Sequence, residues 1–205
     1  MITDVAPGLW IWRIDHPDWH GEDDWDPTVT CTCVESRGAV VAIDPLEDAE
    51  ALQRLDAKPP TAVAILKPDH VRHVDAFVRR YDVKAYGPML FWPDDVPETD
   101  LEPLDPGEEL PGGLLALYDG RGRLETPLWL PEQKTILFAD ALTAPQGELL
   151  VWATPWHEKR TLPALRELLD LPFERVIVAH GEPVHDRDDF RRALERPPYG
   201  RIEGS

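Results

Sequence analysis

The chain has 205 residues, 42% of them hydrophobic, which suits one domain with a sizeable core. Its 39 acidic residues outnumber 21 basic ones, and the formal net charge of −18 argues against nucleic acid or a membrane as a partner. The sequence has no apolar run long enough to span a bilayer and no signal-peptide pattern at its start, so we expect a cytoplasmic protein.

The first half of the chain predicts strands followed by strand–helix alternation. Alternating apolar residues and turn signals indicate strands, whereas apolar residues three and four apart indicate helices. We expect strands at 8–14, 28–34, 39–43, 61–66 and 83–86, and helices at 48–56 and 70–81.

The second half begins with a proline-, glycine- and acid-rich stretch, 91–113, that we expect to be an irregular connection. After it we expect strands at 114–118, 126–130, 135–138 and 175–179, and helices at 161–170 and 188–194. This order favours a sandwich of two sheets with helices outside. We expect a single domain over 1–196 and a flexible tail over 197–205.

Three apolar strands end in residues that can carry chemistry. The run AVAILKPDHVRH places His70, Arg72 and His73 after the first, TILFADAL ends in Asp140, and VIVAHGEPV ends in His180. Sites in layered α/β folds gather where strands end. Taken singly, each residue is better explained as a cap, a turn or a surface group, but the three strand ends together favour a shared pocket.

These segments resemble the metallo-β-lactamase superfamily, which places an H-x-H-x-D-H motif after a central strand, then an Asp and a His after later strands. The resemblance runs from VAPGLWIW and IDPL to HGEPV. It implies an α/β fold, an αββα sandwich of two mixed β-sheets with helices on the outer faces. In the motif, Pro68 and Arg72 stand where the family has a His and an Asp, whereas His70 and His73 match.

The resemblance implies a depleted metal site made of His70, His73, Asp140 and His180. Two histidines and a carboxylate are an accepted catalytic zinc set, so we expect no metal or a single zinc ion, held by His73, Asp140 and His180. Arg72 brings a fixed positive charge to the position of a ligand carboxylate. We expect it to contact Asp140 or a neighbouring glutamate and to supply charge that a metal otherwise supplies.

The remaining site candidates lie in the matched loops. Arg121 falls near the position of another family histidine, in an alignment that can slip by a residue, and His157 lies within reach of the mouth of the site. We expect Asp140, Arg72 and Glu182 to be catalytic, and Arg72, Arg121 and His157 to bind substrate. Glu125, like Glu182, is a candidate partner for the arginines or a general acid or base.

Two functions fit this set of residues. One is a hydrolase of a small anionic ester, thioester or amide, with the arginines binding the anionic group. The other is a catalytically inactive pseudoenzyme or small-anion-binding module on the same fold. Both imply a small-molecule ligand, and nothing in the sequence indicates an oligomeric state.

Overall fold

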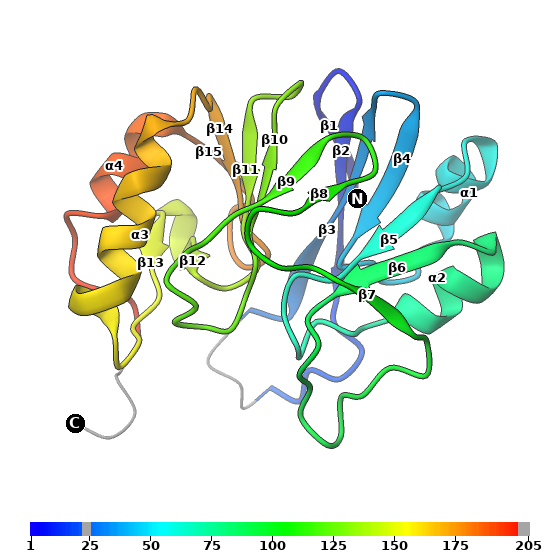
Figure 1. Cartoon of the computed structure of the whole chain (residues 1–205), viewed down its shortest axis with the longest axis horizontal. Helices are drawn as coiled ribbons and strands as arrows, with labels where there is room; N and C mark the ends of the chain where they lie inside the picture. The colour runs from blue at the N-terminus through cyan, green and yellow to red at the C-terminus, as the bar shows by residue number, and fades with distance from the viewer. Residues whose placement is uncertain (22–25, 201–205) are drawn as a thin grey trace.

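Two mixed β-sheets pack face to face, and helices cover the outer face of each sheet, in the computed structural model of the chain (Figure 1). The structure describes residues 1–21 and 26–200. The predicted αββα sandwich is confirmed.

The first sheet has seven strands in sequence order, antiparallel up to the fourth strand and parallel from there on. Its strands are β1 (Ile2–Ala6), β2 (Leu9–Asp15), β3 (Thr28–Ser36), β4 (Ala39–Ile43), β5 (Ala62–Ala64), β6 (Lys84–Gly87) and β7 (Leu101–Pro103). Helices α1 (Ala49–Ala57) and α2 (Val74–Tyr81) cover its outer face.

The second sheet has the order β15-β14-β11-β10-β9-β8, and its one parallel pair is β11 with β14. Its strands are β8 (Glu109–Leu110), β9 (Leu114–Ala116), β10 (Leu128–Leu130), β11 (Thr135–Leu137), β14 (Arg175–Ile177) and β15 (Val184–Asp186). Helices α3 (Leu162–Glu167) and α4 (Arg187–Ala193) cover it, and β12 (Leu142–Thr143) pairs with β13 (Leu150–Val151) beside them. Short helical turns occupy Pro145–Gly147, His157–Thr161 and Leu168–Asp170.

The core has three apolar layers. The middle layer lies between the sheets and includes Ile43, Leu128 and Ile177, all at most 1% exposed. The outer layers join each sheet to its helices, around Phe77 on one side and Phe190 on the other. Burial of this apolar surface fixes both sheets and therefore the positions of their strand ends.

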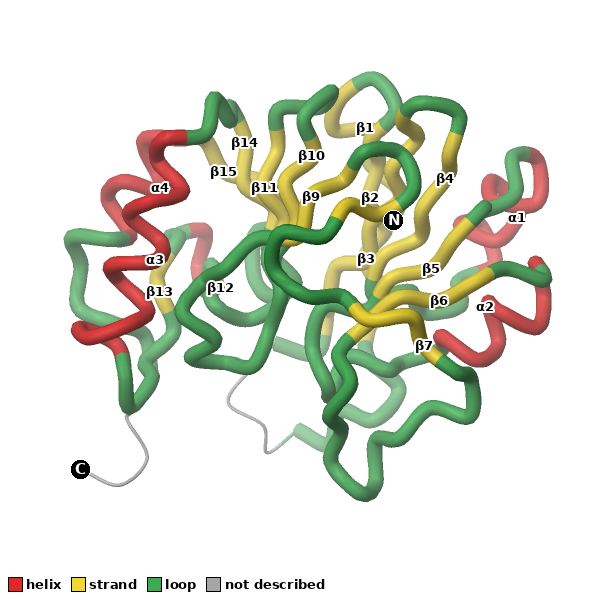
Figure 2. The backbone as a smooth tube through the Cα atoms, in the orientation of Figure 1, coloured by secondary structure: helices red, strands yellow, loops and turns green. Residues whose placement is uncertain are grey.

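Long loops gather along one edge of the two sheets (Figure 2). In the first sheet, strand β4 leads into the IDPL segment and its parallel neighbour β5 into the loop that carries His70. In the second sheet, the parallel strands β11 and β14 lead into the loops that carry Asp140 and His180. Because parallel strands end at the same edge of a sheet, these four loops lie together.

Several predicted boundaries differ from the structure. The stretch 91–113 contains β7 and β8, and the helix expected from 70 begins at Val74. In the described part of the segment expected to be a tail, the backbone of Tyr199 hydrogen-bonds to Val151 and Ala153. Residues 201–205 of that tail lie outside the described residues. Within the described ranges, no helix has both the length and the apolar character that crossing a bilayer requires.

Candidate active site

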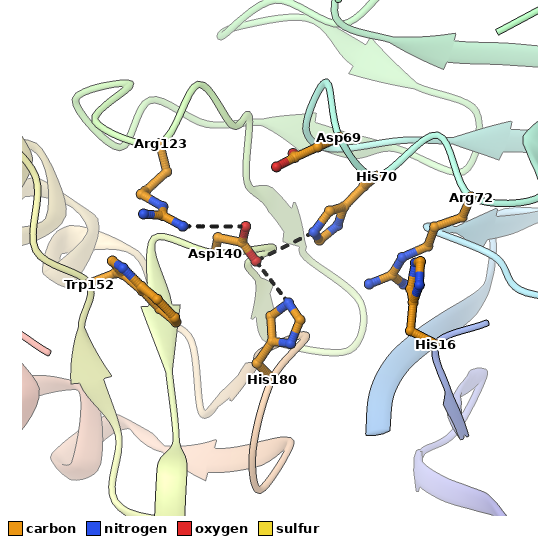
Figure 3. Close-up of a pocket in the computed structure, with 8 residues that line it drawn as sticks. All are labelled: His16, Asp69, His70, Arg72, Arg123, Asp140, Trp152 and His180. Carbon is orange, nitrogen blue, oxygen red and sulfur yellow. Dashed lines mark ion pairs between the residues drawn. The ribbon is translucent and has the colours of Figure 1, made fainter. Parts of the chain in front are cut away.

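A pocket of about 330 Å³ opens at this edge of the sheets (Figure 3). Side chains from the segments between strands line it: His16, Asp69, His70, Arg72, Arg123, Asp140, Trp152 and His180. The structure therefore brings together the three strand ends that the sequence singled out.

Asp140 lies at the centre of the pocket, in the loop after β11. Its Oδ1 lies 3.4 Å from His70 Nε2 and 3.2 Å from His180 Nε2, and its Oδ2 lies 2.9 Å from Lys67 Nζ. Burial raises the pKa of Asp140, but the charges of His70 and Lys67 outweigh burial and hold that pKa well below its usual range. The carboxylate is therefore ionised.

Glu125 fixes the segment that presents Asp140. Its carboxyl group is fully buried and accepts backbone N–H bonds from Ala139, Asp140 and Ala141, the last at 2.6 Å. Burial, then the nearby Asp119 and Asp140, raise the pKa of Glu125 well above its ordinary value. Glu125 thus holds the loop and does not pair with Arg72 or Arg121, contrary to one of the roles expected for it.

His70 is oriented by Asp44, which follows β4 in the segment IDPL. The Asp44 Oδ2 lies 2.8 Å from His70 Nδ1, and its Oδ1 accepts a hydrogen bond of 2.9 Å from the Leu66 N–H. Burial and Arg72 lower the pKa of His70, but Asp44 and Asp140 outweigh them and raise it to about 9. Such a carboxylate–histidine pair fixes the tautomer and the ring orientation of a histidine ligand.

Arg72 lines the pocket, but the expected salt bridge to Asp140, Glu125 or Glu182 is absent among the described residues. Its Nη1 donates instead to the carbonyl of Asp44 at 2.7 Å and to that of Thr30 at 3.2 Å. The backbone of Arg72 is left-handed, with φ of 46°, and its side chain reaches the start of β3 and the residue after β4. The nearest lysine or arginine to Asp140 is Lys67, which was not among the residues expected at the site.

The structure does not bring His73 into the pocket with His70, Asp140 and His180, the other residues of the expected metal set. His73 precedes α2, and its Nδ1 accepts a hydrogen bond of 3.0 Å from the Glu47 N–H. The same nitrogen lies 3.6 Å from the Glu47 carboxylate. Because the helix begins at Val74 and not at 70, His73 and His70 do not share one helical face.

Arg121 also lies outside the pocket. Its guanidinium pairs with Asp105 at 2.7 Å, and its N–H donates to Asp119. Two residues later, Arg123 takes the expected place: its Nη2 lies 4.0 Å from Asp140 Oδ2, and its Cζ lies 4.6 Å from the centre of the Trp152 ring. The arginine of this loop that lines the pocket is therefore Arg123 and not Arg121.

Two further candidates do not line the pocket. Glu182 lines a separate groove beside β1, and His157 is buried, with its pKa lowered by burial in the first place. His16, which the sequence analysis did not select, does line the pocket. Burial, followed by the charge of Arg72, lowers the pKa of His16 to about 4, so its ring is neutral at neutral pH.

The residues present fit one metal ion. The side chains of His70, Asp140 and His180 offer three ligand atoms that all lie within 4.8 Å of one another. Because Asp44 accepts the Nδ1 proton of His70, the Nε2 of a neutral His70 ring directs a lone pair at Asp140 Oδ1. That contact is favourable only with a cation between the two atoms, either a proton on the ring or a bound metal ion.

No family model and no curated protein matches the chain. Among solved structures, it is similar to a metallo-β-lactamase from Erythrobacter litoralis, with 15% identity, a TM-score of 0.67 and coverage of 95% of this chain and 90% of that one. It is similar to the metallo-β-lactamase FIM-1 from Pseudomonas aeruginosa in its mono-zinc form, with 17% identity, a TM-score of 0.67 and coverage of 95% and 94%. It also resembles TTHA1623 in a di-iron-bound form, with 22% identity, a TM-score of 0.60 and coverage of 80% and 93%.

These likenesses cover 80–95% of the chain at low sequence identity. The chain therefore has the metallo-β-lactamase fold, as its motifs predicted.

Proposed function

We propose that the chain is a hydrolase that uses a single metal ion, held by His70, Asp140 and His180, on a small anionic ester, thioester or amide. The observation that carries this proposal is the convergence of the three ligand atoms within 4.8 Å, with the Asp140 carboxylate between two imidazole nitrogens. A set of two histidines and one carboxylate leaves positions open for water and substrate. The mono-zinc form of one similar structure and the di-iron form of another show that proteins of this fold bind metal ions, which supports the proposal.

When bound, such an ion would lower the pKa of a water molecule and polarise a substrate carbonyl group. The chain's own residues prepare the site for it. Asp44 holds the His70 ring with Nε2 directed at Asp140 Oδ1, and Lys67 occupies Asp140 Oδ2, which leaves Oδ1 as the ligand atom. Glu125 holds the backbone of Asp140 in place.

A second metal ion does not suit this site. Lys67 already pairs with Asp140 Oδ2, Arg72 stands at the family's carboxylate position, and Pro68 offers no side-chain ligand. Two cations a few ångströms apart require more anionic ligands than these residues supply. The proposal is therefore limited to one ion.

The ion pair between Lys67 and Asp140 favours a second candidate, a metal-free module that binds small anions. An ammonium group 2.9 Å from the central carboxylate supplies part of the charge that a metal would supply. In that case His70 is protonated and Arg72 and Arg123 bind the ligand. The ligand class is the same in both candidates, a small anionic molecule.

Metal analysis separates the two candidates. After dialysis against zinc and then buffer, we expect one retained equivalent per chain in the wild type and a loss of that equivalent in Asp140→Ala and His180→Ala. The zinc-loaded protein should hydrolyse members of a panel of small carboxylate-bearing esters, thioesters and amides. No retained metal in the wild type would favour the binding module, and two tightly held equivalents would contradict both candidates.

A further inference from the structure

Arg123 differs from the other arginine of the pocket in the partners of its guanidinium group. Arg72 donates through Nη1 to two backbone carbonyls, whereas among the described residues Arg123 makes only a long ion pair of 4.0 Å with Asp140 and a contact with the Trp152 ring. Its side chain is 30% exposed and lines the pocket. The N–H groups of Arg123 are therefore available to a ligand.

Trp152 holds this guanidinium in one plane. The Arg123 Cζ lies over the indole ring, 4.6 Å from its centre, and Trp152 itself is only 6% exposed. A guanidinium stacked on an aromatic face keeps its charge and directs its N–H groups outward from its edge. This arrangement suits bidentate binding of a planar oxyanion.

The C-terminal segment in turn holds Trp152. The Tyr199 ring contacts the Trp152 ring edge to face, at 5.0 Å and 79°. The backbone of Tyr199 bonds to Val151 and Ala153, on both sides of Trp152, at 2.9 and 2.8 Å. Tyr199, 76 positions later in the sequence, thus contacts Trp152, and Trp152 contacts Arg123.

We infer that Arg123 binds a carboxylate group of the ligand, and that Tyr199 is a positioning residue that acts through Trp152. A carboxylate is favoured over a phosphate because Asp69 and Asp140 also line the pocket. A singly charged planar group is repelled less by these acids than a doubly charged phosphate, and it matches the edge of the guanidinium. The inference deepens the proposed function by naming the anionic group of the ligand.

The test is an NMR titration of the metal-free protein with acetate and, separately, with inorganic phosphate, at constant ionic strength. We expect acetate to shift the Trp152 indole N–H resonance, and Arg123→Gln to weaken acetate binding about tenfold or more, as loss of a bidentate charged pair does. Arg121→Gln is the matched control, because Arg121 pairs with Asp105 outside the pocket, and it should bind within about twofold of the wild type. Arg123→Lys should bind more weakly than the wild type, because an ammonium group lacks the planar fork.

Tyr199 is tested by two variants. Tyr199→Phe keeps the ring that contacts Trp152 and should bind acetate like the wild type, whereas Tyr199→Ala should weaken binding about threefold or more without loss of the folded spectrum. Equal acetate binding by the wild type and Arg123→Gln, or an equal loss in Arg121→Gln, would overturn the assignment. Tighter Arg123-dependent binding of phosphate than of acetate would overturn the choice of carboxylate, and unchanged binding by Tyr199→Ala would overturn the positioning role.

These outcomes are separate from those of the proposed function. The titration needs neither a metal ion nor turnover, so the carboxylate site stands or fails whatever the zinc analysis finds. Conversely, Arg123→Gln should retain the same zinc equivalent as the wild type, because Arg123 is not among the metal-ligand atoms.

Discussion

Lys67 and Asp140 form an ion pair of 2.9 Å in which each side chain is only 8% exposed. The ammonium group also pairs with Asp69, so it bridges the buried carboxylate and a more exposed one. Burial lowers the pKa of Lys67, but Asp140 and Asp69 outweigh burial and raise it, so the lysine is charged. The central carboxylate of the pocket therefore has a permanent cation, whether or not a metal ion is bound.

Lys67→Met should make the protein less stable but a stronger binder of zinc. Removal of one partner of a buried ion pair costs up to about 3–5 kcal/mol of unfolding free energy. The loss here should lie toward the low end of that range, because His70 and Arg123 still compensate part of the Asp140 charge. A metal ion would then replace the missing cation and restore part of that stability. Thermal unfolding with and without zinc measures both effects. Lys134→Met, which removes an exposed partner of Glu174, is the control. A Lys67→Met protein with unchanged zinc affinity would contradict the idea that Lys67 and a metal ion compete for Asp140.

The metal-free protein should lose stability as the pH rises from about 6.5 to about 9. The pKa of His70 is raised from 6.5 to about 9 in the folded protein, so the folded state binds the proton more strongly. This stabilisation is complete below the unfolded pKa and is lost as the pH passes through the folded one; a shift of this size corresponds to about 3 kcal/mol. Urea unfolding across this pH range measures it.

Asp44→Asn should flatten this pH dependence, because it removes one of the two carboxylates that raise the pKa of His70. Asp188→Asn replaces an exposed carboxylate on another helix and should leave the pH dependence of stability unchanged. Zinc should bind more tightly as the pH rises through the same range, since metal binding needs a neutral imidazole. Stability that is independent of pH between 6.5 and 9 in the metal-free wild type would count against a protonated His70.

Glu125→Gln should be tolerated, and Glu125→Ala should not. Because the folded pKa of Glu125 is raised, its ionised form opposes folding at neutral pH, and a neutral amide removes that cost. The amide oxygen still accepts from Asp140 and Ala141, and only the long 3.3 Å bond from the Ala139 N–H loses its acceptor. Alanine leaves three buried N–H groups without an acceptor, at about 1–3 kcal/mol each. Chemical denaturation at pH 7 should show a loss of less than about 1 kcal/mol for Gln and of more than about 3 kcal/mol for Ala. Equal losses would contradict the role of Glu125 as a backbone acceptor.

His73→Ala should leave zinc affinity within about twofold of the wild type, whereas His70→Ala should lower it by about 100-fold or more. The reason is the direction of the two side chains: His70 Nε2 faces Asp140, and His73 bonds to the Glu47 N–H. Isothermal titration with zinc compares the two variants. A large loss for His73→Ala would restore the metal set that the motif alone predicted.

The sequence predicted the residues that end the central strands, because apolar strand patterns fix where a strand stops. His70, Asp140 and His180 were found in this way, and the fold class followed from the order of the elements. The direction of a side chain in a loop was not predictable, since it depends on backbone angles that no periodicity encodes. Arg72 illustrates this point, because its positive φ turns it toward backbone carbonyls.

Other misses have separate physical reasons. Lys67 was overlooked because lysine is no metal ligand, although it lies in the same strand end as His70. Arg123 was missed because a loop with two glycines has no periodic pattern that shows which side chain points into the pocket. Only the folded structure shows that Arg123, and not Arg121, lines it. Asp44 had a signal, the acidic turn IDPL, but a lone Asp after a strand does not reveal the histidine it orients.

The pocket carries two positively charged arginines, whereas the whole chain has a net charge of −18, and this difference in sign affects the rate of ligand binding. At distances beyond the screening length, about 8 Å at physiological ionic strength, an anion approaching the protein experiences mainly repulsion. Only inside the pocket do Arg72 and Arg123 attract it. Added salt should therefore speed the arrival of an anionic ligand while it weakens the final contact, so the association and dissociation rates should both rise with ionic strength.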